Sequence, residues 1–176
     1  MLSLLGLLAL GAPAWALDSG LAGKPMPLLA GKNLNGEVRS LPADFRGKPG
    51  VLVAGFSMGS RADATAWATK IAHQHASKGN LDAYVLVVVE APAFIEPLVA
   101  AAMRAGQPAD LYKWGMTVMD PDRALRAQLG VVDDAKGQIV LVGPDGKVRW
   151  ATGEGYSAAR WAAFEQALAA MAPVKR

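Results

Sequence analysis

The pattern of hydrophobic and polar positions predicts alternating strands and helices through the middle of this chain. Val51 to Phe56 and Tyr84 to Val89 are apolar runs. The second run is rich in β-branched residues, which is typical of a strand covered on both faces in a parallel sheet. A helix is predicted between them from Arg61 to about Ala76, and a second helix from Phe94 to Arg104. This order of elements indicates an α/β fold.

The flanking segments complete a single domain. A turn at Asn35-Gly36 between two short strands predicts an N-terminal β-hairpin, and Trp114 to Met119 is predicted to be an edge strand or a third strand. Gln138 to Val142 and Lys147 to Ala151 form a second predicted hairpin, followed by a helix from Ser157 to Ala170. With 176 residues, 52% of them hydrophobic, the chain is long enough for one well-packed domain and too short for two.

Residues 1–16 resemble a secretory signal. This apolar segment ends in Ala14-Trp15-Ala16, which matches an A-x-A cleavage site. Its apolar run is shorter than the ~20 residues that a membrane-spanning helix needs. It lacks a basic residue near its beginning, which suggests a true start upstream of Met1. We expect cleavage after Ala16, a periplasmic or otherwise exported protein, and one domain over residues 17–176.

Composition and spacing exclude several function classes. The chain contains no cysteine, which excludes disulfides, thiol catalysis, thiolate metal sites and thioether haem attachment. Its formal net charge of +3 includes no run of Lys or Arg, which argues against nucleic-acid binding. His73 and His75 lie two residues apart on a predicted helix, so they point to different faces and are expected at the surface. No metal and no cofactor is predicted.

The strand-to-helix corner after Phe56 is the predicted binding site. Gly59 lets the backbone bend there, and Ser60 with Asp63 matches a capping box at the helix start. Ligands gather at such corners in α/β folds, because free amide groups at a helix start carry partial positive charge. We expect Arg61 to bind an anionic group on a partner. The simpler interpretation is that Ser60 only caps the helix and Arg61 is solvated.

Arg149 and Trp150 form a second predicted binding pair on the last strand. Consecutive side chains on a strand point to opposite faces, so one of the two faces the core and the other faces solvent. If Trp150 is buried, Arg149 is exposed or pairs with Glu154. If Trp150 is exposed, the pair forms a docking surface, because Trp and Arg dominate the energetics of protein interfaces.

The order of elements resembles the thioredoxin-like fold in its peroxiredoxin and cytochrome-maturation form. The residues that carry this resemblance are Gly23-Lys24-Pro25, Leu34 to Val38, Phe45 to Pro49 and the strand leading to Phe56. Redox-active members carry one or two cysteines at the helix start, at places that align near Arg61 and Ala64. They also carry a cis-proline before the last hairpin, where this chain has Ala135 to Gly137. Both features are absent, so the resemblance implies no thiol chemistry here.

A closer resemblance links the last hairpin to thioredoxin-like proteins that lack the active cysteines. Gln138 to Tyr156 is similar to segments of the mitochondrial ATP-synthase assembly factor family and of the periplasmic YtfJ family. Lys147 to Ala151 is the core of the match, with Trp67 in support. The resemblance implies a central mixed sheet flanked by helices.

These resemblances predict a redox-inactive exported protein that acts as a protein-binding, assembly or chaperone module of the cell envelope. Its partner is expected to be a protein, with a membrane or envelope complex as one candidate. The alternative is a non-thiol enzyme or a small-anion-binding protein that uses the helix start from Ser60 to Asp63. Neither reading assigns a catalytic residue.

We predict that the purified chain will neither reduce insulin disulfides nor consume peroxide above the background rate. The nucleophile of both reactions is a thiolate, and the sequence contains no cysteine. Turbidity and peroxide assays on a preparation checked by mass spectrometry measure this. Thiol-type turnover that persists through further purification would contradict the prediction.

We also predict that residues 1–16 are removed on export. Intact-mass measurement of the protein from the cell envelope should give the mass of a chain that begins at Leu17. A recovered chain that still begins at Met1 would show that the segment is not a cleaved signal.

Overall fold

The computed structural model describes residues 20–45 and 47–171, and the predicted signal lies outside these residues. The strands are β1 (Leu29–Asn33), β2 (Val38–Leu41), β3 (Gly50–Gly55), β4 (Asp82–Val89), β5 (Gly115–Met119), β6 (Gln138–Val142) and β7 (Val148–Thr152). The α-helices are α1 (Arg61–Gln74), α2 (Glu96–Ala105), α3 (Ala124–Gln128) and α4 (Ala158–Ala169). Short 3-10 turns include η2 (Ala43–Phe45), η3 (Ala76–Lys78), η4 (Ala93–Ile95) and η5 (Ala109–Leu111).

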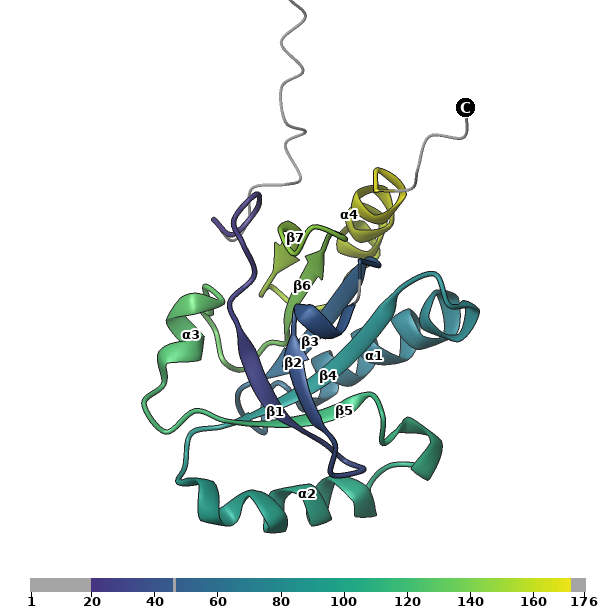
Figure 1. The fold of residues 1–176 in the computed structure, drawn as a ribbon. Helices are drawn as coiled ribbons and strands as arrows, with labels where there is room; N and C mark the ends of the chain where they lie inside the picture. The colour runs from purple at the N-terminus through teal and green to yellow at the C-terminus, as the bar shows by residue number, and fades with distance from the viewer. Residues whose placement is uncertain (1–19, 46, 172–176) are drawn as a thin grey trace, which may run out of the picture.

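All seven strands join one mixed sheet in the order β2-β1-β5-β4-β3-β6-β7, with helices on its faces (Figure 1). β3, β4 and β5 are parallel, whereas β6 pairs antiparallel with both β3 and β7. The predicted α/β fold with a mixed sheet is confirmed. No helix among the described residues combines the length and the apolar character needed to cross a bilayer.

The N-terminal hairpin forms as predicted and extends the sheet. Gly36 at its turn has φ 86, a left-handed conformation that glycine adopts without steric cost. The Asn33 Oδ1 accepts hydrogen bonds from the backbone N–H groups of Asn35 and Glu37, which fixes the turn. β1 then pairs antiparallel with β5. β5 is therefore an internal strand, and the predicted option of an edge strand is wrong.

The alternation of side chains along β3 divides the core into two layers. Val51 and Val53 face α1 and α4, whereas Leu52 and Ala54 face the layer that includes Phe45 of η2. Side chains in both layers are almost completely buried. The central sheet thus packs on both faces, as the continuous apolar runs predict.

Trp67 of α1 is the centre of an aromatic cluster that joins α1, α4 and β7. Its ring centroid lies 5.8 Å from that of Trp150, 5.9 Å from that of Trp161 and 6.1 Å from that of Phe164. Trp67 and Phe164 are both fully buried. Because aromatic contacts of this kind bury large apolar areas, the cluster fixes α1 and α4 against the sheet.

His75 corrects the prediction that both histidines lie at the surface. His73 is exposed, but His75 is buried. The Nε2 of His75 lies 2.9 Å from the Oε1 of Glu165, and its ring packs against Trp161 and Phe164. α4 covers this end of α1, which the sequence pattern of α1 alone does not reveal. The two rings do point to different faces, as predicted.

Candidate functional site

The corner between β3 and α1 lacks the predicted capping box. A side-chain hydrogen bond to its own backbone is present instead. Ser60 is the residue before α1, and its side chain makes no capping hydrogen bond. Its buried hydroxyl instead donates to the carbonyl oxygen of Ser57 at 2.8 Å. Gly55 leaves room for this contact, because a Cβ there would lie 3.0 Å from the Ser60 Oγ. The predicted capping box is therefore wrong.

Asp63 joins the first turn of α1 to two distant loops. Its Oδ2 accepts a hydrogen bond of 2.8 Å from the N–H of Gly137, which precedes β6. Its Oδ1 accepts a hydrogen bond of 2.5 Å from the N–H of Tyr156, which follows β7. Hydrogen bonds to a charged acceptor are about twice as strong as those between neutral groups. One carboxylate therefore connects three segments of the chain at the corner.

Gly137 lies directly over α1, at the place that aligns with the cis-proline loop of redox-active thioredoxin-like proteins. A Cβ on Gly137 would lie 3.2 Å from the Asp63 Oδ2 and 3.2 Å from the Ala64 Cα. The same loop is fixed from the other side, because the Ser57 Oγ donates to the carbonyl oxygen of Asp134 at 2.6 Å. The loop before β6 therefore closes tightly over the first turn of α1.

Arg61 is exposed and lies beside the end of α2 rather than over the start of its own helix. A Cβ on Gly106, which follows α2, would lie 3.7 Å from the Arg61 Nη2 and 3.9 Å from the carbonyl oxygen of Ala102. Carbonyl groups at a helix C-terminus carry partial negative charge, so a cation is favourable there. The Arg61 guanidinium forms no hydrogen bond or ion pair with any residue that the structure describes, and only its backbone N–H donates, to the carbonyl oxygen of Met58. Its predicted role in binding stays a prediction.

A second network closes the opposite side of the corner. The carboxylate of Glu90, just after β4, pairs with Arg123 at 3.0 Å and with Arg126, and Arg126 also pairs with Asp134 at 3.0 Å. Hydrogen bonds to Glu90 and then to Asp134 raise the pKa of Arg126 above its usual value. The Arg126 guanidinium lies 5.7 Å from the ring centroid of Phe56. The sequence pattern did not single out this network, in which Arg123 directly precedes α3 in a left-handed conformation (φ 57) and Arg126 lies on α3.

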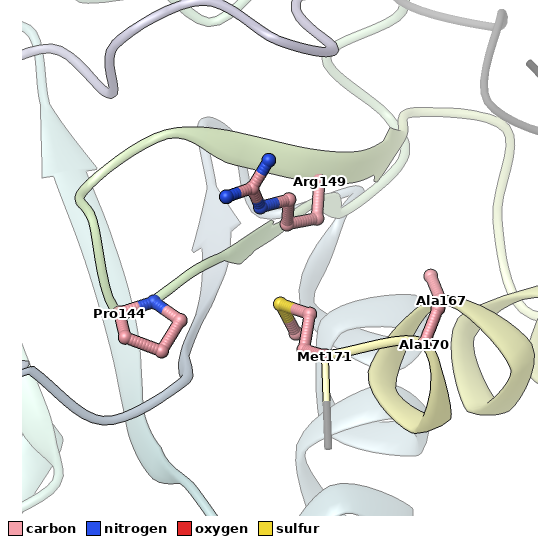
Figure 2. A pocket seen from close by; sticks show the side chains of 5 residues that line it. All are labelled: Pro144, Arg149, Ala167, Ala170 and Met171. Carbon is pink, nitrogen blue, oxygen red and sulfur yellow. The ribbon is translucent and has the colours of Figure 1, made fainter. Parts of the chain in front are cut away.

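The second predicted pair divides between the core and the surface. Trp150 is buried against Trp67, so its indole is not available as a docking surface. Arg149 is exposed and pairs with Asp145 at 2.7 Å rather than with Glu154, which pairs with Arg160. Arg149 also lines a hollow of about 450 Å³, and Figure 2 shows its side chain.

That hollow is not part of the corner. It is lined by Pro144, Arg149, Ala167, Ala170 and Met171, near the end of α4 (Figure 2). Asp63 instead contacts the loop that leads into the start of α4. The structure therefore brings Gly59, Ser60, Arg61 and Asp63 together and leaves Arg149 apart from them.

The polar side chains of Ser60 and Asp63 at the corner are not free to act in catalysis. The Ser60 hydroxyl is buried and already donates to a carbonyl oxygen, and both oxygens of Asp63 are engaged by backbone N–H groups. His73 lies in the last turn of α1, about 18 Å along the helix from Arg61. No group of three or more His, Asp or Glu side chains within residues 20–45 and 47–171 is arranged to hold a metal ion.

Comparisons with known proteins identify the fold. No family model matches the chain, and no curated protein matches it. Among solved structures, it is similar to the pneumococcal exposed lipoprotein thioredoxin from Streptococcus pneumoniae, with a TM-score of 0.55 and 22% identity over 82% of this chain and 99% of that one. It is also similar to a putative thiol:disulfide interchange protein DsbE from Chlorobium tepidum, with a TM-score of 0.58 and 21% identity over 85% and 96% of the two chains.

A third similar structure is BsSco, a member of the Sco family of cytochrome c oxidase assembly proteins. Its TM-score is 0.57, with 15% identity over 84% of this chain and 94% of that chain. These similarities show that the chain has a thioredoxin-like fold, as predicted, and that it has this fold without any cysteine.

We predict that Asp63→Asn will destabilise the protein by about 2 kcal/mol. The amide group of Asn offers one acceptor oxygen instead of two and places an N–H group against a backbone N–H, while hydrogen bonds to charged groups contribute about 1.5–3 kcal/mol each. Asn keeps one of the two bonds in a weakened form, so at this half-buried position we expect a loss worth about one such bond. Urea unfolding followed by circular dichroism measures the change.

Asp122→Asn is the matched control. Asp122 is exposed and forms no hydrogen bond or ion pair within the described part of the chain. The free energy of unfolding of the Asp122→Asn variant should therefore differ from that of the unmodified protein by less than about 0.5 kcal/mol. Equal unfolding midpoints for the Asp63 and Asp122 variants would show that the carboxylate bridge does not stabilise the corner.

Proposed function

We propose that this protein is a redox-inactive, exported binding module that uses the loops around the corner to hold a protein partner of the cell envelope. The observation that carries the proposal is the Asp63 bridge. Between Arg61 and Ala64, the places that align with the reactive thiols of redox-active members of this fold, this chain has a carboxylate whose two oxygens bind its own backbone. Such a corner is suited to act as a fixed scaffold rather than as a reacting centre.

Exposed apolar side chains around the corner support a role in binding. The side chains of Met58 and Val132 are 80% and 100% exposed. They lie on two loops that the hydrogen bond from Ser57 to Asp134 holds together. Exposed apolar groups beside a cation suit a protein surface with apolar and acidic groups. We call Met58, Arg61 and Val132 the corner surface.

The fold neighbours are compatible with this proposal. One of them is named as an exposed lipoprotein, and another belongs to a family of cytochrome c oxidase assembly proteins. An assembly role for the present chain would need a stable scaffold and a surface for its partner, and it would need no thiol. The export of this chain rests on its predicted signal.

The alternative, a non-thiol enzyme or an anion-binding protein at Ser60 to Asp63, has less support from the geometry. A helix start attracts anions through its free amide groups. Here the carboxylate of Asp63 already lies in the first turn, where its negative charge disfavours a second anion. Ser60 is buried, so its hydroxyl does not face a substrate.

Photo-cross-linking in the native envelope tests the proposed function. A photoreactive amino acid at Met58 should form a covalent adduct with a protein partner, identified by mass spectrometry. Arg61→Ala in the same chain should reduce the yield by at least about fivefold, because the cation is removed while the fold is kept. Arg61 makes no described ion pair, so this variant should unfold within about 0.5 kcal/mol of the unmodified protein.

Lys48 is the control position for the cross-link. It is exposed and precedes β3, whereas Met58 follows β3, so the two lie at opposite ends of the strand. A photoreactive residue at Lys48 should give no adduct with the same partner. Equal adducts from both positions, or an unchanged yield in Arg61→Ala, would remove the corner surface from the proposed site.

A further inference from the structure

The helix α2 has an unusual distribution of side chains. Its charged residues, Glu96 and Arg104, turn toward the domain, where Glu96 pairs with Lys32 at 3.2 Å and the Arg104 Nε donates to the carbonyl oxygen of Leu34 at 2.8 Å. A helix on the surface of a soluble domain usually turns its charges outward and its apolar face inward. In α2 the inward face is mixed, because buried Ala100 and half-buried Val99 and Met103 lie on it beside the two charged residues, and the outward face is apolar.

The outward face of α2 and the preceding turn is a continuous apolar stripe. Phe94 and Leu98 are 81% and 73% exposed, and the other exposed members are small. The stripe consists of Phe94, Pro97, Leu98, Ala101, Ala102 and Ala105. Residues spaced by three and four positions lie on one helix face, so these side chains form one surface. α2 lies at the border of the domain beside β5 in Figure 1.

The side chains of the stripe are large at its N-terminal end and small at its C-terminal end. Phe94 and Leu98 lie toward the N-terminal end, whereas the C-terminal half presents alanines. Two copies packed antiparallel about a two-fold axis would place Phe94 against Ala105, and Leu98 against Ala101 of the second copy. A two-fold interface must be self-complementary, and this pairing of large with small residues satisfies that condition. A parallel pairing would instead place the two Phe94 side chains against each other.

Charge favours the same orientation. Antiparallel helices align their dipoles favourably, and the cation Arg61 lies at the C-terminal end of the stripe while Glu96 lies at its N-terminal end. In the antiparallel pair, Arg61 of each copy lies toward the acidic end of the other helix. The outward face of α2 itself carries no charge among the described residues that would have to be desolvated.

We infer that α2 mediates a weak two-fold dimer of this chain, in which the stripes of two copies pack antiparallel. The surface from Phe94 to Ala105 is roughly 18 Å long and about 10 Å wide. This is well below the ~800 Å² per partner of a stable interface, so the dimer is expected to be weak. It shares Arg61 with the corner surface, whereas Phe94 and Leu98 belong to the stripe alone, so a change at Leu98 tests the dimer without changing the corner surface.

Sedimentation velocity of the purified chain from about 5 μM to about 500 μM tests the inference. The unmodified chain should shift from monomer to dimer over this range, and Leu98→Lys should raise the dissociation constant at least about tenfold by placing a charge in the apolar contact. The control is Leu28→Lys, which changes an exposed apolar residue just before β1, outside both the stripe and the corner surface, and should leave the dissociation constant unchanged. Circular dichroism confirms that each variant is folded.

Engineered cysteines test the orientation, because the chain has no thiol of its own. In the antiparallel pair, Ala101 of the two copies is offset by about 4.5 Å along the helix axis and Ala105 by about 16 Å. A disulfide needs Cα atoms within about 7 Å. Ala101→Cys should therefore form an intermolecular disulfide at least about tenfold faster than Ala105→Cys.

Three results would overturn the inference. One is a chain that stays monomeric up to about 500 μM, which would leave the stripe for a different protein or a lipid surface. The other is equal cross-linking of the two cysteine variants, which would exclude the antiparallel pairing. A dimer that Leu98→Lys does not weaken would place the contact elsewhere on the molecule and would also contradict the proposal.

Discussion

The carboxylate of Asp63 is the interaction on which the geometry of the corner depends. It accepts two backbone hydrogen bonds from residues that are 74 and 93 positions away in the sequence. These bonds hold the first turn of α1 against the loop before β6 and the loop after β7. The N–H of buried Gly137 would otherwise lack a protein partner where water has little access, which is costly. The corner is therefore fixed by electrostatics and by packing together.

The fixed corner suits the proposed binding role, which needs no thiol. The parallel strands and the aromatic cluster around Trp67 position α1 in the same way whatever its first turn carries. The corner then becomes a rigid platform on which Met58 and Val132 are exposed. Binding surfaces benefit from such rigidity, because less conformational entropy is lost when a partner binds.

The two faces of the domain differ in how completely they are covered. The layer under α1 and α4 is closed by aromatic rings, and the opposite layer is closed by η2 and α3. α2 is the exception, since it presents apolar side chains to solvent and attaches to the domain through Ala100 together with its two charged residues. Exposed apolar surface of this kind costs solubility, which is why it is usually retained where another molecule covers it.

The sequence by itself determined the α/β class, the two hairpins, the order of strands and helices, and the position of the corner. These features follow from local periodicity and turn residues such as Gly36, whose effects extend over a few positions. It also determined the absence of thiol chemistry, because the lack of cysteine is a property of the composition and does not depend on the fold.

Tertiary structure decided what the side chains at these positions do. Asp63 bridges two loops instead of forming the predicted capping box, and the Ser60 hydroxyl donates to Ser57. His75 is buried under α4. Glu90 pairs with two arginines at the start of α3, more than 30 positions away. The partners of Asp63, His75 and Glu90 depend on which distant segments meet in space, and no local pattern specifies hydrogen-bond partners that far along the chain.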